Sequence, residues 1–227
     1  MDVEQAVDRL RSMGDPKAVE GMARFGIQSS NSFGVSVPKI RTLAREAGRD
    51  HQLALKLWET GLHDARLLAS MVDDPAQVTI DQMDRWVRDF DSWDIVDGSC
   101  GTLFDKTPFA VAKAREWCKR EEEFVKRAGF VLMAELAVHD KHAKDKLFLD
   151  FLPFIIAGAS DKRNFVKKAV NWALRQIGKR NLKLNRAAVS TALKLQKNQS
   201  GTAKWVASDA LRELKSPQVQ KRLRKNM

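Results

Sequence analysis

The chain has 227 residues, with 40 Lys and Arg against 29 Asp and Glu, which gives a formal net charge of +11. Such a length buries a sizeable core without the help of disulfides or structural metals. The cationic excess favours a polyanionic partner, most often nucleic acid, over the alternative that the basic surface serves only solubility. The two cysteines, Cys100 and Cys118, are too few for a disulfide framework or a cysteine metal cluster. No apolar run approaches the roughly 20 residues of a membrane span. We therefore expect a cytoplasmic protein with reduced thiols.

Helix-capping signals recur along the chain. Asp15–Pro16 and Thr107–Pro108 each place a capping residue before a proline suited to the first helical position, and Gly48 and Gly61 suit helix C-termini. Strand signals are nearly absent, so we expect an all-α fold of paired antiparallel helices. The predicted helices cover residues 2–13, 16–25, 38–47, 51–60, 64–73, 80–89, 92–104, 108–119, 121–138, 143–157, 163–179, 183–196 and 201–215.

Three stretches in the second half resemble one another. EFVKRAGFVLMAEL at 123–136 resembles NFVKKAVNWALRQI at 164–177, an offset of 41 residues, and KKAVNWAL at 167–174 resembles KWVASDAL at 204–211, an offset of 37. Such periods indicate HEAT-type helix pairs, which stack into a solenoid with a concave, here basic, face. No composition shift marks a linker, so we predict one continuous domain over 1–227. Its basic tail, from about 216, either contacts the partner or frays.

The helix predicted over 163–179 has two opposed faces. Four apolar residues share one face: Val166, Val170, Ala173 and Ile177. A tryptophan and three cations share the other: Lys168, Trp172, Arg175 and Lys179. Because Trp is buried on average, one interpretation of Trp172 is packing between repeats. We favour the other, in which the cations hold phosphates and the indole stacks on a base or a cation.

The segment SWDIVDGSCGTLF, 92–104, carries a carboxylate in an aromatic and apolar stripe. Trp93 and Asp97 lie four apart and project from one helix face, and Cys100 and Phe104 continue the stripe. Asp94, one position off, points elsewhere. The alternative for Asp97 is a carboxylate satisfied by a neighbouring helix cap or an arginine.

Two further candidates have weaker support. Arg127 opposes the apolar residues of its predicted helix and, taken alone, is a solvated surface arginine. Its position on a helix of a successive repeat would let a solenoid gather it with Trp93, Asp97 and Trp172. His139 and His142 have a spacing that suits a metal, but no third ligand is evident and a solvated helix end is the better interpretation.

These segments, in this order, resemble the AlkD family of alkylpurine DNA glycosylases, which are built from HEAT-like repeats. The resemblance runs from MARFG near residue 22 to ALREL near 210, and its best motifs are SWDIVD, FVKRA and NFVKKAVNWALRQIGKRN. It implies that Trp93 and Asp97 match the family's active-site Trp and Asp, Arg127 its cleft Arg, and Trp172 its second cleft Trp. Phe25 stands where the characterised enzymes have Tyr, so the ring is kept but a hydrogen-bond donor is lost.

The resemblance also implies a function: a monofunctional glycosylase that needs no metal or cofactor and releases cationic N3- or N7-alkylated purines from duplex DNA. Such purines leave without protonation, so a fixed carboxylate, Asp97, suffices to stabilise the oxocarbenium-like sugar and to position water. Trp93 and Trp172 would contact the cationic nucleotide. Arg127 and the row of cations beside Trp172 would hold flanking phosphates. We expect a monomer.

Two other functions stay open. The first is a non-catalytic protein that binds damaged or branched DNA, which Phe25 favours because it lacks the donor of the family's tyrosine. The second is a protein–protein adaptor, a common use of helical repeats.

Overall fold

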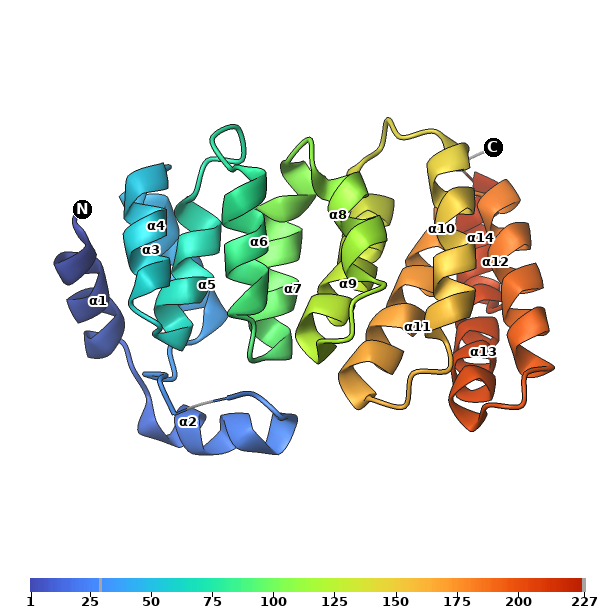
Figure 1. Cartoon of the computed structure of the whole chain (residues 1–227), viewed down its shortest axis with the longest axis horizontal. Coiled ribbons are helices and arrows are strands. Elements are labelled where there is room, and N and C mark those ends of the chain that lie inside the picture. Colours follow the sequence, from blue (N-terminus) through green and yellow to red (C-terminus); the bar gives the residue numbers. More distant parts are fainter. Residues whose placement is uncertain (29, 226–227) are drawn as a thin grey trace. The chain divides into compact units, whose positions relative to one another are not determined.

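The computed structural model describes residues 1–28 and 30–225 (Figure 1). Helices make up all of its regular elements, and the described residues contain no strand. The all-α prediction is therefore confirmed. The chain forms two compact units, one covering residues 1–109 and the other beginning at Ala110.

Several helices of the first unit begin or end at the residues that the sequence marks as caps. Asp15 caps a helix that begins at Pro16, and Gly48 and Gly61 adopt φ values of 73° and 68° just after helices end, a conformation that glycine reaches without strain. These three signals are confirmed. The elements are α1 (Val3–Ser12), α2 (Pro16–Met22), η1 (Ala23–Phe25), α3 (Val37–Ala47), α4 (His51–Glu59), α5 (His63–Val72), α6 (Ile80–Arg88), α7 (Trp93–Thr102) and η2 (Phe104–Lys106).

Within this unit α3, α5 and α7 pack in order, and α4 packs on α5 (Figure 1). The amphipathic pattern of each helix buries its apolar stripe in the shared core. The indoles of Trp58 and Trp86 stack with ring centroids 4.0 Å apart. The largest fully buried side chains include Leu10, Ile40, Leu43, Leu57, Leu68, Met83, Ile95 and Phe104. The core thus fixes α7, which carries Trp93 and Asp97.

The second unit consists of helix pairs in which α8 packs on α9, α10 on α11, and α12 on α13. Gly129 permits a close approach of α9 to the end of α8, because a Cβ there would lie 2.2 Å from the backbone nitrogen of Cys118. The elements are α8 (Ala110–Trp117), α9 (Glu123–His139), α10 (Asp145–Gly158), α11 (Asn164–Gly178), α12 (Leu182–Gln196), α13 (Gly201–Leu214) and α14 (Pro217–Lys225).

The three similar stretches fall on α9, α11 and α13, each the second helix of its pair, and α11 packs against both of the others (Figure 1). Two side-chain bonds across α11 and α13, from Asn171 to Asp209 and from Arg175 to Glu213, share one sequence separation of 38 residues. A constant separation means that the two helices run parallel and in register. The repeat prediction is thereby confirmed for this unit.

Two local predictions need correction. The tail from about 216 does not fray over residues 217–225 but folds as α14, whose Val219 and Leu223 are buried. Its contact with the partner stays a prediction, and residues 226 and 227 lie outside the described part. The helix expected from Pro108 begins at Ala110, because the Thr107 hydroxyl instead donates to the Phe104 carbonyl at 2.8 Å and closes η2.

Both cysteines are free and buried, and burial raises the pKa of the Cys118 thiol to about 11. A thiol with such a pKa stays protonated and is a weak nucleophile. In the described part of the chain, no helix combines the length and apolar character that a membrane span requires.

Candidate functional site

Trp93 and Phe25 come together in the first unit. Trp93 is the first residue of α7, and its indole Nε1 donates a hydrogen bond to the main-chain carbonyl of Phe25 at 3.0 Å. Phe25 ends η1, and the next residue, Gly26, turns the chain with a φ of 71°. Phe25 itself is 71% exposed. Two predicted site residues are thus linked, although Phe25 contributes its backbone to the link and leaves its ring open to solvent.

Asp97 lies one turn after Trp93 on α7 and is half-buried. The stripe predicted to contain it divides in two, because Cys100 and Phe104 are fully buried in the core while Trp93 and Asp97 keep solvent access. Asp97 therefore lies at the partly exposed end of an apolar stripe, one helical turn from Trp93. Partial burial lowers the local dielectric and strengthens the field of a charge there.

Asp94 has a structural partner that the sequence did not reveal. Its carboxylate lies 2.9 Å from Nε2 of His63 at the start of α5 and also accepts from the Ser92 hydroxyl. Burial opposes the charge of Asp94, but His63 and Ser92 hold its pKa below the ordinary value. Burial likewise opposes the charge of His63, but Asp94, with further acidic neighbours, raises the pKa of His63. This ion pair ties the first turn of α7, which carries Trp93, to α5.

Arg127 is not a solvated surface arginine. It is only 5% exposed, and its guanidinium donates to the main-chain carbonyl of Phe165 at 2.7 Å. Phe165 is in the first turn of α11, where its ring lies 5.7 Å from that of Phe124 on α9. Arg127 therefore links α9 to the start of α11, the helix that carries Trp172.

The faces of α11 are as predicted. Its four apolar residues Val166, Val170, Ala173 and Ile177 are fully buried. On the other face Trp172 is half-buried and Lys168 is exposed.

The cations Arg175 and Lys179 lie on that face but share a carboxylate. Glu213 on α13 is 2.5 Å from an Arg175 guanidinium nitrogen and 2.6 Å from Nζ of Lys179. Burial opposes the charge of Glu213, yet Lys179 and Arg175 hold its pKa below the ordinary value. Part of the predicted row of cations is therefore neutralised by an ionised glutamate that the sequence analysis did not consider.

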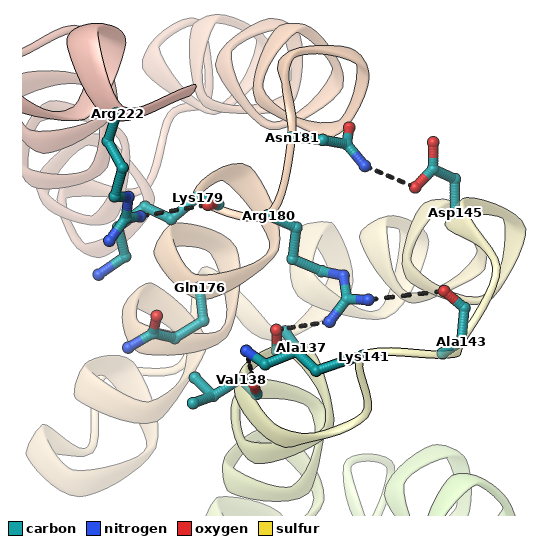
Figure 2. Close-up of a pocket in the computed structure, with 10 residues that line it drawn as sticks. All are labelled: Ala137, Val138, Lys141, Ala143, Asp145, Gln176, Lys179, Arg180, Asn181 and Arg222. Atoms are coloured by element: carbon teal, nitrogen blue, oxygen red, sulfur yellow. Dashed lines mark hydrogen bonds between the residues drawn. The ribbon is translucent and has the colours of Figure 1, made fainter. Parts of the chain in front are cut away.

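A basic pocket of about 550 Å³ lies at the C-terminal ends of α9 and α11 (Figure 2). Arg180 donates to the carbonyls of Ala137 and Ala143 and lies 4.0 Å from the Phe148 ring centroid. Lys141 and Arg222 also donate to main-chain carbonyls near these helix ends. Cations are favoured at helix C-termini, where carbonyls lack partners. The cations that line this pocket are accounted for by their hydrogen bonds to main-chain carbonyls. We therefore do not assign the pocket as a phosphate site.

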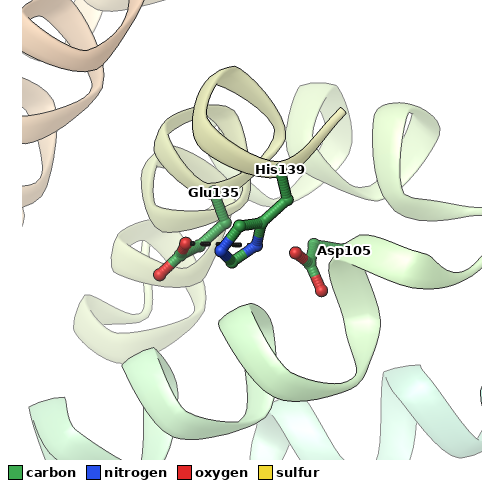
Figure 3. Close-up of side chains that lie close together, drawn as sticks. All are labelled: Asp105, Glu135 and His139. Carbon is green, nitrogen blue, oxygen red and sulfur yellow. Dashed lines mark ion pairs between the residues drawn. The ribbon is translucent and has the colours of Figure 1, made fainter. Parts of the chain in front are cut away.

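The two histidines considered for a metal lie at the end of α9. His139 is its last residue, and Nδ1 lies 3.6 Å from the Glu135 carboxylate one turn earlier (Figure 3). His142 is exposed in the following loop.

These features define a class of protein: paired helical repeats with a net positive charge, a carboxylate one turn from an indole on one repeat helix, and an indole among lysines and arginines on another. The family model of the DNA alkylation repair enzyme matches residues 6–214. The chain belongs to this family.

Relatives and a solved structure extend the comparison. Two uncharacterized proteins, from Listeria innocua and Listeria monocytogenes, are each 21% identical over 136 residues, which cover 58% of this chain and 61% of the relative. A solved structure from a new family of proteins related to the HEAT-like repeat DNA glycosylases, with affinity for branched DNA structures, has a TM-score of 0.78. It is 20% identical and covers 94% of this chain and 96% of that chain, so the HEAT-like fold is shared.

Proposed function

We propose that this chain is a DNA glycosylase that hydrolyses the N-glycosidic bond of cationic N3- or N7-alkylated purines in duplex DNA. The observation that carries the proposal is the half-buried carboxylate of Asp97 one turn from Trp93 on the same face of α7. The family membership supports a role in DNA alkylation repair.

The chemistry needs few groups. Alkylation at N3 or N7 makes the purine cationic, so it leaves as a neutral base without a general acid. As the bond stretches, positive charge develops on the sugar, and the Asp97 carboxylate stabilises that charge and orients a water molecule for attack. Trp93 offers the electron-rich face of its indole to the cationic nucleotide, a contact worth about 0.5–2 kcal/mol. Asp97 is the catalytic residue in this scheme.

The remaining predicted residues bind DNA in this proposal. Lys168 is exposed and Trp172 half-buried on one face of α11, and together they contact phosphate and sugar. Arg175 and Lys179 contribute when phosphates compete with Glu213 for them. Arg127 acts through its bond to Phe165, and the exposed ring of Phe25 lies against the DNA surface. The protein acts as a monomer in the cytoplasm, without a metal or cofactor.

The test is release of free bases from methylated duplex DNA, with three proteins compared at saturating concentration. Wild type should release 3-methyladenine or 7-methylguanine, and Asp97→Asn should not. Asp91→Asn is the matched control, because Asp91 is an exposed carboxylate shortly before α7 that lies 3.9 Å from Arg66. It should behave as wild type.

A second candidate function is binding of branched DNA without base release. The solved structure of the same fold comes from a family with that affinity, and Phe25 lacks the phenolic donor of the AlkD-type tyrosine. Under this alternative Asp97→Asn and wild type would bind forks equally and neither would release a base.

A further inference from the structure

An exposed indole lies on α13, outside the residues considered above. Trp205 is 41% exposed, whereas the apolar residues that pack α13 are buried elsewhere on the helix: Ala203, Val206, Ala207, Ala210 and Leu214. Trp is rarely left open to solvent to this extent. The packing of α13 does not require the indole.

One lysine packs on this indole, and two more are adjacent to the pair in the sequence. The Lys167 ammonium lies 4.8 Å from the ring centroid of Trp205, a cation–π arrangement across α11 and α13. Lys168 and Lys204 are exposed next to these two residues in the sequence, and neither forms an ion pair with a described residue. Neither α11 nor α13 has an acidic residue in its first turn, where one would be favoured. The surface is therefore complementary to an anion.

The same surface adjoins the face of α11 that carries Trp172. Lys168 lies one turn before Trp172 on α11, and α13 runs parallel to α11 in register. In this register of 38 residues, Trp205 takes the position of Lys167, the lysine that its ring contacts. Where α11 presents a cation, α13 presents an aromatic ring. A DNA strand with a phosphate bound by Lys168 would meet the Trp205 indole on the next repeat helix.

We propose that Trp205, with Lys167, Lys168 and Lys204, is a stacking site for an unpaired nucleobase of DNA, such as the single-stranded arm of a flap or fork. Bases within a duplex have both faces covered, so an exposed indole stacks only on a base that is unpaired or terminal, while lysines hold the adjacent phosphates. This inference rests on the proposed DNA-binding function and names the DNA form that would engage the second unit.

The experiment measures fluorescence anisotropy of the full chain with two labelled DNAs of matched sequence, a fork with a single-stranded arm and a fully paired duplex. Trp205→Ala should bind the fork roughly 10-fold more weakly than wild type, as loss of one stacked base predicts, with less than a roughly twofold change on duplex. Trp205→Phe, which keeps a ring, should recover most of the affinity. Leu193→Ala is the matched control, because Leu193 on α12 is 42% exposed and apolar.

Thermal unfolding of each variant checks that the fold is intact, and an exposed residue should leave Tm unchanged. Equal fork binding by Trp205→Ala and wild type would overturn the inference. So would equal losses on fork and duplex, or a wild type that does not prefer the fork. Base release from methylated duplex is measured in parallel, and because Trp205 is outside the reacting site, Trp205→Ala should keep the wild-type rate. Failure of the stacking site is thus distinguished from failure of the glycosylase proposal.

Discussion

The Trp93 indole and the Phe25 carbonyl are joined by one hydrogen bond of 3.0 Å across 68 residues of sequence. This bond connects the start of α7 to the turn that exposes the Phe25 ring. It gives the two residues different roles: Trp93 supplies a donor and a ring, and Phe25 supplies an acceptor from its backbone.

Trp93→Phe should therefore loosen the turn without unfolding the unit. A single lost hydrogen bond lowers the free energy of unfolding by about 0.5–1.5 kcal/mol, which urea denaturation measures. Base release should also fall, because the turn that contains Phe25 loses its bond to α7. Phe25→Ala keeps the carbonyl and removes an exposed ring, so it should leave the free energy of unfolding within about 0.5 kcal/mol of wild type. Equal destabilisation by the two variants would argue against the hydrogen bond as the link.

The main effect of Arg127→Ala should be on the stability of the protein, not on the reaction that it catalyses. The change leaves the partly buried carbonyl of Phe165 without its guanidinium donor, and such a group costs about 1–3 kcal/mol. Urea denaturation measures the loss. Arg120→Ala is the comparison, because Arg120 is exposed and pairs with the exposed Glu122 two residues away, and we expect a smaller change there. A fully stable Arg127→Ala would mean that Arg127 does not secure α11.

The His63–Asp94 pair predicts a pH dependence of stability. The pKa of His63 is raised from 6.5 in the folded protein, so its contribution is complete below pH 6.5 and is lost as the pH rises through the folded value. The pKa of Asp94 is lowered from 3.8, so its contribution is present above pH 3.8 and is lost as the pH falls through the folded value. Between pH 3.8 and pH 6.5, therefore, both groups stabilise the folded protein.

Urea denaturation of His63→Asn at a series of pH values tests this. The variant should lack the decline in unfolding free energy that wild type shows above pH 6.5. His142→Asn, a change at an exposed histidine, should retain the wild-type profile. A decline of equal size in His63→Asn would assign the titration to another group.

Glu213→Gln should strengthen DNA binding. It removes the carboxylate that lies 2.5 Å from Arg175 and 2.6 Å from Lys179. Lys179 then becomes available for phosphates, and Arg175 retains the more distant carboxylate of Asp209 at 3.8 Å. The slope of log affinity against log salt should steepen by about 1–2, measured by anisotropy with unmodified duplex. Glu46→Gln removes the partner of Arg9 on α1 and changes net charge equally. The same gain in Glu46→Gln would attribute the effect to net charge alone.

Sequence patterns predicted what depends on a single helix. The buried face of α11 was predictable from periodicity. Four apolar residues at helical spacing lie on one face of the helix, and they are buried together when that face packs on the core. Asp15 and Gly48 marked helix ends because each meets a local backbone need. The helix α14 was missed because only Val219 and Leu223 supply its apolar stripe among basic residues.

Contacts between helices were beyond such patterns. Arg127 is buried and donates to the carbonyl of Phe165, 38 residues later, whereas a helical wheel of α9 alone places it at the surface. The carboxylate of Glu213 and the imidazole of His63 lie on other helices than the residues they pair with. Packing decided these pairings, and one sequence carries no direct signal of them.

The most direct test of the account is the single-turnover rate of base release from methylated duplex DNA by wild type and Asp97→Asn, with DNA affinity measured on the same substrate. The account predicts release by wild type and a rate at least about 100-fold lower in the variant, with affinity changed by less than about threefold. Equal rates in the two proteins, or no release by a wild type that binds the duplex, would contradict it.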